Sequence, residues 1–287
     1  MRHLSRRRFM AAGAFAAGAA SIGITRATAA DPQASLDKFG GFKVGIQSNA
    51  LARFNQDMGE TLGHITDLGL YWAEIVEAYY PITQDEAKIA EAAALLARHD
   101  VKMESFFLGD IDVTQEDQGR RLFEFAKKTG VSMLVVQPLL ESFPILDPLV
   151  KEYDIKIAVH NHGPDHRFDR MEDAIKAVAP CDWRVGFCLD TGHCMRTGEN
   201  PVEAVRRLGH RMFALHVRDH AYLRRQRSIP ETIIGEGALD LKGLFRALRD
   251  VHFDGPISLE MYKTRADPLP EYRPSIANFA AAAQATV

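Results

Sequence analysis

The chain has 287 residues, with 35 Lys or Arg against 38 Asp or Glu, so its formal net charge is −3 at pH 7. Nucleic-acid binding depends on a basic surface that neutralises phosphates, and this acidic balance argues against it. The three cysteines, Cys181, Cys188 and Cys194, form no C-x-x-C pair and are too sparse for a disulfide framework, although a single bond between Cys181 and Cys194 stays open.

The first thirty residues have the pattern of an export signal. Three arginines at 6–8 precede an Ala/Gly-rich apolar stretch from Phe9 to Ile24, and small residues follow at 27–29. The hexapeptide SRRRFM at residues 5–10 resembles the twin-arginine signal, which a transporter reads when it moves folded proteins across the bacterial inner membrane. We therefore expect residues 1–30 to be a twin-arginine signal peptide, the Tat export machinery to be a partner, and the mature protein to be periplasmic. An uncleaved membrane anchor and an ordinary secretory signal are the alternatives.

Residues 31–287 are expected to form one soluble domain. Cleavage removes five of the 35 basic residues and no acid, which leaves 30 basic against 38 acidic residues. No later stretch reaches the roughly 20 apolar residues that a membrane-spanning helix needs. Whether the mature chain acts as a monomer or a homo-oligomer is left open.

Short apolar segments rich in β-branched residues recur along the mature chain. There are eight, at residues 43–47, 73–77, 102–107, 133–137, 156–160, 185–190, 212–217 and 256–261. Amphipathic segments separate them; in residues 83–100, for example, Ile89, Ala93, Leu96 and Ala97 fall on one helical face. Near-continuous apolar strands that alternate with helices are typical of a parallel sheet covered by helices.

Eight such units predict an α/β fold, a single-domain (β/α)8 TIM barrel over residues 31–287. No G-x-G-x-x-G motif follows the first strand, which argues against an open, doubly wound sheet. Turn signals at Gly69, Asp100, Gly130 and Asp154 end several of the intervening segments. Between the fourth and fifth strands, three prolines at 138, 144 and 148 predict a long, irregular loop with only a short helix.

The carboxyl ends of all eight strands meet at one rim of such a barrel, where active sites assemble. The last four strands end on His160, Asp190, His216 and Glu260. A buried carboxylate is costly unless it is paired or binds a cation, so these four side chains predict a metal site. Imidazole mixed with carboxylate suits zinc, manganese, iron or cobalt better than calcium. The alternative is that each is a rim residue satisfied by a neighbour.

Four segments carry a resemblance to a known family. They are GFCLDTGH (186–193), ALHVRDH (214–220), IGEGALDL (234–241) and ISLEMY (257–262), and they resemble the xylose-isomerase-like barrel superfamily of sugar isomerases, epimerases and dehydratases. The resemblance implies one divalent metal ion (Mn, Zn, Mg, Co or Fe) held by Asp190, His216 and Glu260. The fourth ligand of that family is a Glu after the fifth strand, where this sequence has His160.

The resemblance implies a metal-dependent isomerase or epimerase that acts on a sugar or keto-sugar through an enediolate. Glu260 would be one base, with His193 or His162 as a second acid/base group. Because a metal-bound imidazole has no free lone pair, His160 weakens a mechanism based on two carboxylates. A keto-sugar lyase or dehydratase is therefore the closest alternative. A phosphodiester hydrolase and a non-catalytic periplasmic carbohydrate-binding barrel are more distant ones.

Further residues are predicted to bind the carbohydrate substrate. Arg218 would share the side of His216 if the seventh strand continued, and Asp219 would then point away and orient a ligand. Glu236 lies in a G-E-G segment where the backbone can approach a ligand. Glu74 and His166 complete the predicted substrate-binding set.

Overall fold

The structure is a computed structural model that describes residues 32–54, 57–262 and 267–287. The predicted signal peptide at residues 1–30 lies outside the described residues. Within the described part of the chain, no helix is long and apolar enough to cross a membrane.

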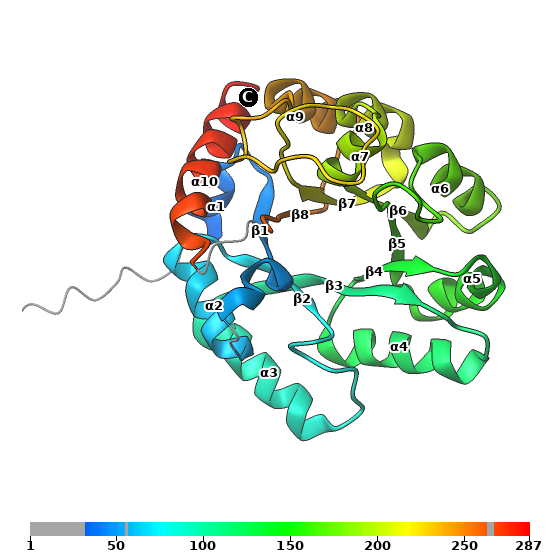
Figure 1. Ribbon diagram of the computed structural model, residues 1–287. Helices are drawn as coiled ribbons and strands as arrows, with labels where there is room; N and C mark the ends of the chain where they lie inside the picture. The colour runs from blue at the N-terminus through cyan, green and yellow to red at the C-terminus, as the bar shows by residue number, and fades with distance from the viewer. Residues whose placement is uncertain (1–31, 55–56, 263–266) are drawn as a thin grey trace, which may run out of the picture.

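Eight parallel strands close into a barrel in chain order, with β1 paired to β8, and the predicted TIM barrel is confirmed. The strands are β1 (Lys43–Gln47), β2 (Trp72–Val76), β3 (Lys102–Ile111), β4 (Met133–Pro138), β5 (Lys156–His160), β6 (Val185–Asp190), β7 (Met212–Val217) and β8 (Pro256–Leu259). All eight match predicted segments, although β3 is longer and β8 shorter than expected. Figure 1 views this barrel end on.

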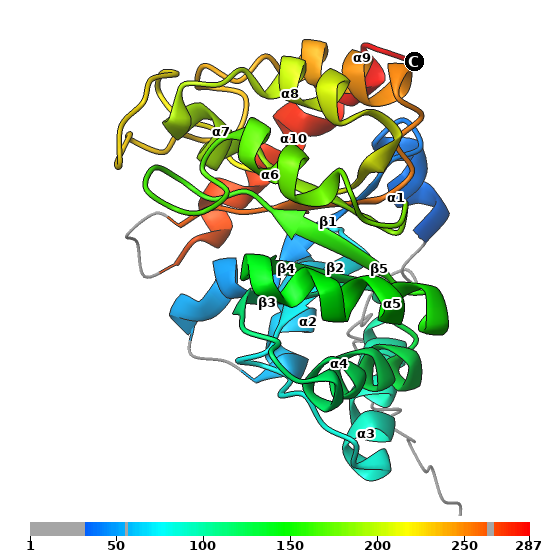
Figure 2. The same cartoon turned by 90° about the vertical axis from the view of Figure 1, so that its right-hand side faces the viewer.

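Helices surround the barrel (Figures 1 and 2). They are α1 (Pro32–Lys38), α2 (Met58–Asp67), α3 (Glu86–His99), α4 (Glu116–Thr129), α5 (Phe143–Tyr153), α6 (Met171–Val178), α7 (Thr191–Thr197), α8 (Pro201–Leu208), α9 (Leu241–Asp250) and α10 (Leu269–Gln284). Short 3-10 turns cover η1 (Ser48–Phe54), η2 (Leu140–Ser142) and η3 (Gly209–Arg211). The segment from β7 to α9 is long and contains no helix.

The predicted turn signals have a backbone reason. Gly69, Asp100, Gly130 and Asp154 all have positive φ, between 53° and 74°. This left-handed conformation ends a helix by satisfying its last carbonyls, as Asp100 does for α3 and Gly130 for α4. Each turn returns the chain to the start of the next strand.

The expected irregular loop between β4 and β5 is wrong, because α5 fills it with eleven helical residues. Pro144 stands in the first turn, where its missing N–H costs nothing. Pro148 removes one internal hydrogen bond, but burial of Phe143, Leu146 and Leu149 on one face offsets that loss. Tertiary packing therefore overrides the local signal of the prolines.

The barrel interior is filled below the carboxyl ends of its strands. Met133, Val135, Ala158, Cys188, Phe213 and Ala214 form a buried cluster there, with Phe107 packed against it. The Phe107 ring lies 5.4 Å from the His160 ring and 5.9 Å from the His216 ring, measured between centroids. This apolar cluster is the floor of the site described next. All three cysteines are free, and Cys188 is buried in the floor.

Candidate metal centre

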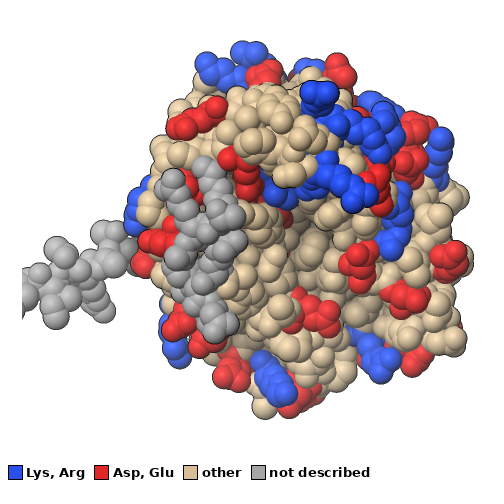
Figure 3. Space-filling model, viewed as in Figure 1, with Lys and Arg blue, Asp and Glu red and all other residues tan. Residues whose placement is uncertain are grey.

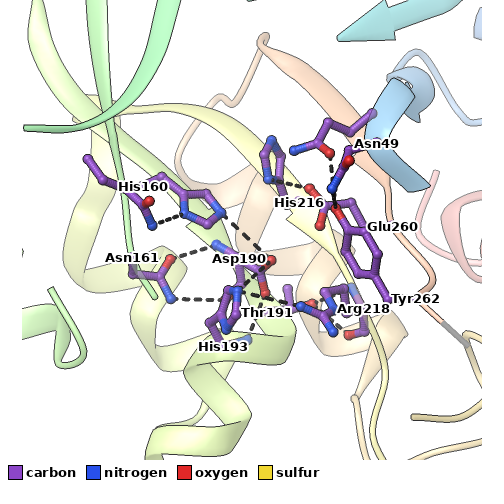
Figure 4. A network of polar contacts seen from close by, with 12 residues as sticks. Asn49, His160, Asn161, Asp190, Thr191, His193, His216, Arg218, Glu260 and Tyr262 are labelled. Carbon is purple, nitrogen blue, oxygen red and sulfur yellow. Dashed lines mark hydrogen bonds and ion pairs between the residues drawn. The ribbon is translucent and has the colours of Figure 1, made fainter. Parts of the chain in front are cut away.

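Four predicted ligands lie together at the carboxyl ends of β5 to β8 (Figure 4). His160 and Asp190 are the last residues of β5 and β6, His216 is the last but one of β7, and Glu260 directly follows β8. Their exposed fractions are 3%, 0%, 0% and 3%. Each strand thus delivers one polar side chain to the rim above the apolar floor, as the parallel barrel requires.

The ligand atoms are close enough to share one ion. One atom from each of His160, Asp190 and His216 lies within 4.8 Å of the other two. His160 Nε2 is 3.7 Å from Asp190 Oδ2, and Glu260 Oε1 is 2.7 Å from His216 Nδ1. Glu260 therefore adjoins the three-residue cluster through His216.

The buried atoms that face one another lack hydrogen-bond partners. The buried atoms without a hydrogen-bond partner are His160 Nε2, Asp190 Oδ2, both ring nitrogens of His216, Glu74 Oε1 and Glu260 Oε1, since the short contacts of His216 with Glu74 and Glu260 lack hydrogen-bond geometry. An unsatisfied buried polar atom costs about 1–3 kcal/mol, and several in one place would be a heavy cost without a function. Two imidazoles and two carboxylates fit a divalent cation of the zinc, manganese or iron type.

Each histidine ligand is oriented by a residue from the first half of the barrel. The Gln137 side-chain amide lies 3.0 Å from His160 Nδ1, and Nε2 of that ring faces Asp190. If Nε2 binds a metal, Nδ1 carries the proton and the amide oxygen accepts it. Glu74 Oε1 lies 2.7 Å from His216 Nε2, and the Ser105 hydroxyl donates to the other Glu74 oxygen at 2.7 Å. A carboxylate on the far nitrogen of a histidine ligand fixes the ring and increases its basicity.

Asp190 is held by its own helix and by Asn161. Its Oδ1 accepts the His193 backbone N–H at 2.7 Å as the N-cap of α7, so Oδ2 is left to face His160. The Asn161 side chain exchanges two hydrogen bonds with the Asp190 backbone, at 2.6 and 3.1 Å. These bonds fix the carboxylate before any ion binds.

The electrostatics around the cluster favour a cation. Burial alone would raise the pKa of Asp190, but His193, His160 and Arg218 outweigh it and hold that pKa well below its usual range. Burial would likewise lower the pKa of His216, but Cys188, Glu74 and Glu260 raise it well above 6.5. The same surroundings that raise the pKa of His216 would favour a cation in the cluster.

Three further histidines stand beside the cluster, neutral at physiological pH. Burial and the neighbouring His160 and His166 lower the pKa of His162 to about 4, and burial also keeps the pKa of His193 well below 6.5. The rings of His162 and His193 lie 4.0 Å apart. His166 is farther out, with Nε2 3.3 Å from Asp110. In Figure 4, His160 and His193 lie on one side of Asp190, and His216 and Glu260 lie on the other.

The other predicted substrate-binding residues are divided between the centre and the periphery. Arg218 is buried beside His193 and the Tyr262 ring, although β7 ends before it. Glu236 is exposed in the β7–α9 segment, away from the four ligands, and its role stays a prediction. Glu74 lies inside the barrel as the neighbour of His216.

The expectation that Asp219 orients a ligand is wrong. Its carboxylate accepts backbone N–H groups from Gly235, Gly237 and Leu239, at 2.9 to 3.0 Å. The Asp219 carboxylate therefore stabilises the fold of the β7–α9 segment. Its oxygens accept hydrogen bonds from that segment and do not orient a ligand. Glu104, near the amino end of β3, contacts Lys43 and Trp72 at the amino ends of β1 and β2, at the opposite end of the barrel from the candidate ligands.

Sequence reasoning missed the role of several neutral or aromatic residues. No role was predicted for Gln137, which ends the fourth predicted strand, or for Asn161 and Tyr262. The positions of the last two could have indicated a role, because Asn161 directly follows His160 and Tyr262 lies two residues after Glu260. The Tyr262 hydroxyl donates to Gln47 at 3.0 Å, which fixes the ring over Arg218.

Comparisons with known proteins agree with this architecture. A family model described as "Xylose isomerase-like TIM barrel" matches residues 63–282. The inosose dehydratase of Clostridium botulinum (strain Alaska E43 / Type E3) is 27% identical over 147 residues, which cover 46% of this chain and 46% of that protein. The chain thus matches about half the length of this curated relative.

Two solved structures share the fold at low identity. The 3-keto-D-glucoside 4-epimerase of E. coli superposes with a TM-score of 0.66 at 18% identity, covering 83% of this chain and 98% of that one. The IOLI protein, solved with a zinc atom, superposes with a TM-score of 0.62 at 20% identity, covering 85% and 96%.

Proposed function

Because the chain belongs to the xylose isomerase-like TIM barrel family, we propose that it is a divalent-metal-dependent enzyme that isomerises or epimerises a sugar or keto-sugar. The observation that carries the proposal is the set of four buried, unsatisfied ligand atoms at the ends of β5 to β8. The zinc bound by the IOLI protein and the keto-sugar in the name of the E. coli epimerase support it.

His160, Asp190, His216 and Glu260 would hold the metal. Bound there, a divalent ion supplies electrophilic polarisation of a carbonyl and its neighbouring hydroxyl. The free oxygen of the Glu260 side chain would accept the proton from the carbon next to the carbonyl, which yields an enediolate. The apolar floor around Phe107 excludes water from below.

The second proton-transfer group would be an imidazole. His193 lies on the side of Asp190 opposite Glu260 (Figure 4), and the His162 ring lies 4.0 Å from the His193 ring. Both imidazoles are neutral, so either could accept a proton from that side. Glu260 and one of these two histidines would then take the place of the two carboxylates that a symmetrical epimerase uses. Reprotonation of the enediolate from the opposite side gives epimerisation, and reprotonation at the neighbouring carbon gives isomerisation.

A lyase is the second candidate, favoured by the match to inosose dehydratase. After the same proton abstraction, loss of a β-hydroxyl assisted by a general acid would give elimination. The two candidates share every residue up to the enediolate.

One experiment separates them. The metal-loaded protein is incubated with a panel of sugars and 3-keto-glycosides in deuterated water. Deuterium in an intact sugar indicates isomerisation or epimerisation, whereas loss of water or of an aglycone indicates a lyase. The proposal fails if the purified protein binds no divalent metal, or if His216→Ala retains full activity.

We also propose that residues 1–30 direct the protein to the periplasm through the twin-arginine pathway, on the strength of the SRRRFM segment. Replacement of Arg6 and Arg7 by Lys should leave the precursor in the cytoplasm in a cell-fractionation assay. A periplasmic location for that variant would contradict the proposal.

A further inference from the structure

A cavity beside the metal centre is lined by three arginines and two glutamates. Its volume is about 510 Å³, and it is lined in part by Arg196, Arg218, Arg227, Glu231 and Tyr262. It lies under the segment that follows β7. In Figure 3, Lys and Arg side chains gather on that side of the central hollow.

His193 connects this cavity to the metal centre. Its Nδ1 lies 3.2 Å from an Arg196 terminal nitrogen, and its Nε2 lies 3.5 Å from one of Arg218. The same Nε2 is 3.9 Å from Asp190 Oδ2. A neutral imidazole has only one acceptor nitrogen, so His193 can accept a hydrogen bond from only one of the two guanidinium groups.

The positive charge in the cavity is only partly balanced. Among the described residues, Arg196 makes no ion pair, and its buried Nε has no hydrogen-bond partner. Burial and the charge of Arg218 lower the pKa of Arg196. Glu231 is already engaged, because its two oxygens accept from Arg218 Nε at 3.2 Å and from the Tyr262 backbone at 3.0 Å.

Three acids accompany the three arginines. Glu231 is held by Arg218, and Arg227, which is 81% exposed at the rim, pairs with Asp165, while Glu271 also lines the cavity. Within the ranges that the structure describes, Arg196 is therefore the arginine of this cavity that makes no ion pair.

The backbone makes room for the two inner guanidinium groups. A Cβ on Gly163 would lie 2.6 Å from an Arg196 terminal nitrogen, and a Cβ on Gly192 would lie 2.6 Å from the Arg218 Cβ. Contacts below 3.0 Å require something to move. The Thr191 hydroxyl also exchanges hydrogen bonds with the Arg218 backbone, at 2.7 and 2.9 Å. The local fold thus fixes both arginines in the wall.

We propose that the cavity between Arg196, Arg218 and Arg227 binds an anionic group of the substrate, a carboxylate or a phosphate, so that the enzyme acts on an acidic sugar derivative. Guanidinium groups bind such oxyanions through paired, charge-assisted hydrogen bonds. The identity of the ligand as a sugar rests on the proposed function, whereas the anion site itself does not.

The first test measures anion binding without a sugar or a metal. Inorganic phosphate is titrated calorimetrically into the EDTA-treated protein at fixed ionic strength. We expect saturable binding that weakens at least about tenfold in Arg196→Gln and less in Arg196→Lys, which keeps the charge but not the paired donors. Arg224→Gln is the matched control, because its backbone N–H donates to Met195, next to Arg196, but the residue does not line the cavity. No binding, or equal loss in the control, overturns the proposal.

The second test identifies the source of the anion in the manganese-loaded protein. D-glucuronate, D-glucose 6-phosphate and D-glucose are compared as ligands. We expect one acidic sugar to bind at least about tenfold tighter than glucose, and the tighter of the two names the carboxylate or the phosphate. Equal affinity of all three overturns the acidic-sugar substrate. If the protein binds no metal, the proposed function fails while the phosphate titration still reports on the cavity.

Discussion

Strands β5 to β8 and strands β1 to β4 contribute different chemistry to the same rim. The second half ends on the four candidate ligands, His160, Asp190, His216 and Glu260. The first half contributes Gln47, Glu74 and Gln137, and each of these contacts one residue of the second half: Tyr262, His216 and His160 in that order.

This division separates binding from positioning. Among the side chains with buried, unpartnered atoms at this site, His160, Asp190, His216 and Glu260 come from the second half, and Glu74 comes from the first. Gln47, Glu74 and Gln137 of the first half contact residues of the second. A catalytic constellation needs both, because a ligand that can rotate loses affinity and geometry. We therefore expect mutations of candidate ligands in the second half to reduce metal affinity more than mutations of orienting residues in the first half.

The largest effect is expected for a ligand of the second half. Asp190→Asn keeps the side-chain size, but it replaces one carboxylate oxygen by an NH2 group and removes the negative charge. We expect metal affinity to fall by more than about 100-fold, beyond the usual effect of losing an orienting group. Metal titration of the folded variant, checked by circular dichroism, measures it. Affinity within a few-fold of the wild type would remove Asp190 from the ligand set.

An orienting residue of the first half should have an intermediate effect. In Glu74→Gln the side chain can still accept a hydrogen bond from Ser105, but it no longer places a carboxylate beside His216. We expect metal affinity or activity to fall by roughly 10–100-fold. Glu104→Gln is the matched control, because this acid pairs with Lys43 at the opposite end of the barrel. If both variants behave alike, the positioning role of Glu74 is wrong.

Acid should destabilise the second half first, because burial lowers the pKa of several of its histidines, among them His220. Burial and Arg218 lower the pKa of His220 to about 4, from 6.5. The unfolded chain therefore binds more protons than the native chain between these values, and stability falls as the pH drops from 6.5 towards 4.

We expect His220 to account for a loss of about 2 kcal/mol between pH 6.5 and pH 4.5, or roughly 30-fold in the unfolding equilibrium. Urea denaturation at the two pH values measures it, and His220→Gln should show a smaller difference. Hydrogen exchange should increase around β5 to β7 before α3 and α4. A uniform increase would show that acid does not distinguish the halves.

The smallest effect is expected at Gln137. Gln137→Leu removes the contact with His160 Nδ1 but leaves all four ligands, so metal affinity should fall by about tenfold, at the lower end of the range for such partners. The same titration measures it. A loss as large as that of Asp190→Asn would mean that Gln137 is itself a ligand, and the division between the halves would need revision.

The sequence alone determined the barrel and the position of the candidate ligands along the chain. Apolar runs and left-handed turn residues are local signals, and the carboxyl ends of parallel strands must meet at one rim. His160, Asp190, His216 and Glu260 could therefore be found without coordinates. The helical state of α5 could not, because burial of Phe143, Leu146 and Leu149 against neighbouring elements decided it.

Only the tertiary structure decided which side chains orient the ligands and what adjoins them. Glu74 reaches His216 because closure of the barrel places β2 across from β7, and no local pattern encodes that pairing. Arg196 and Arg218 likewise belong to α7 and to the segment after β7, and they share a cavity through His193. Strand ends follow from local periodicity, whereas contacts across the barrel depend on register and closure.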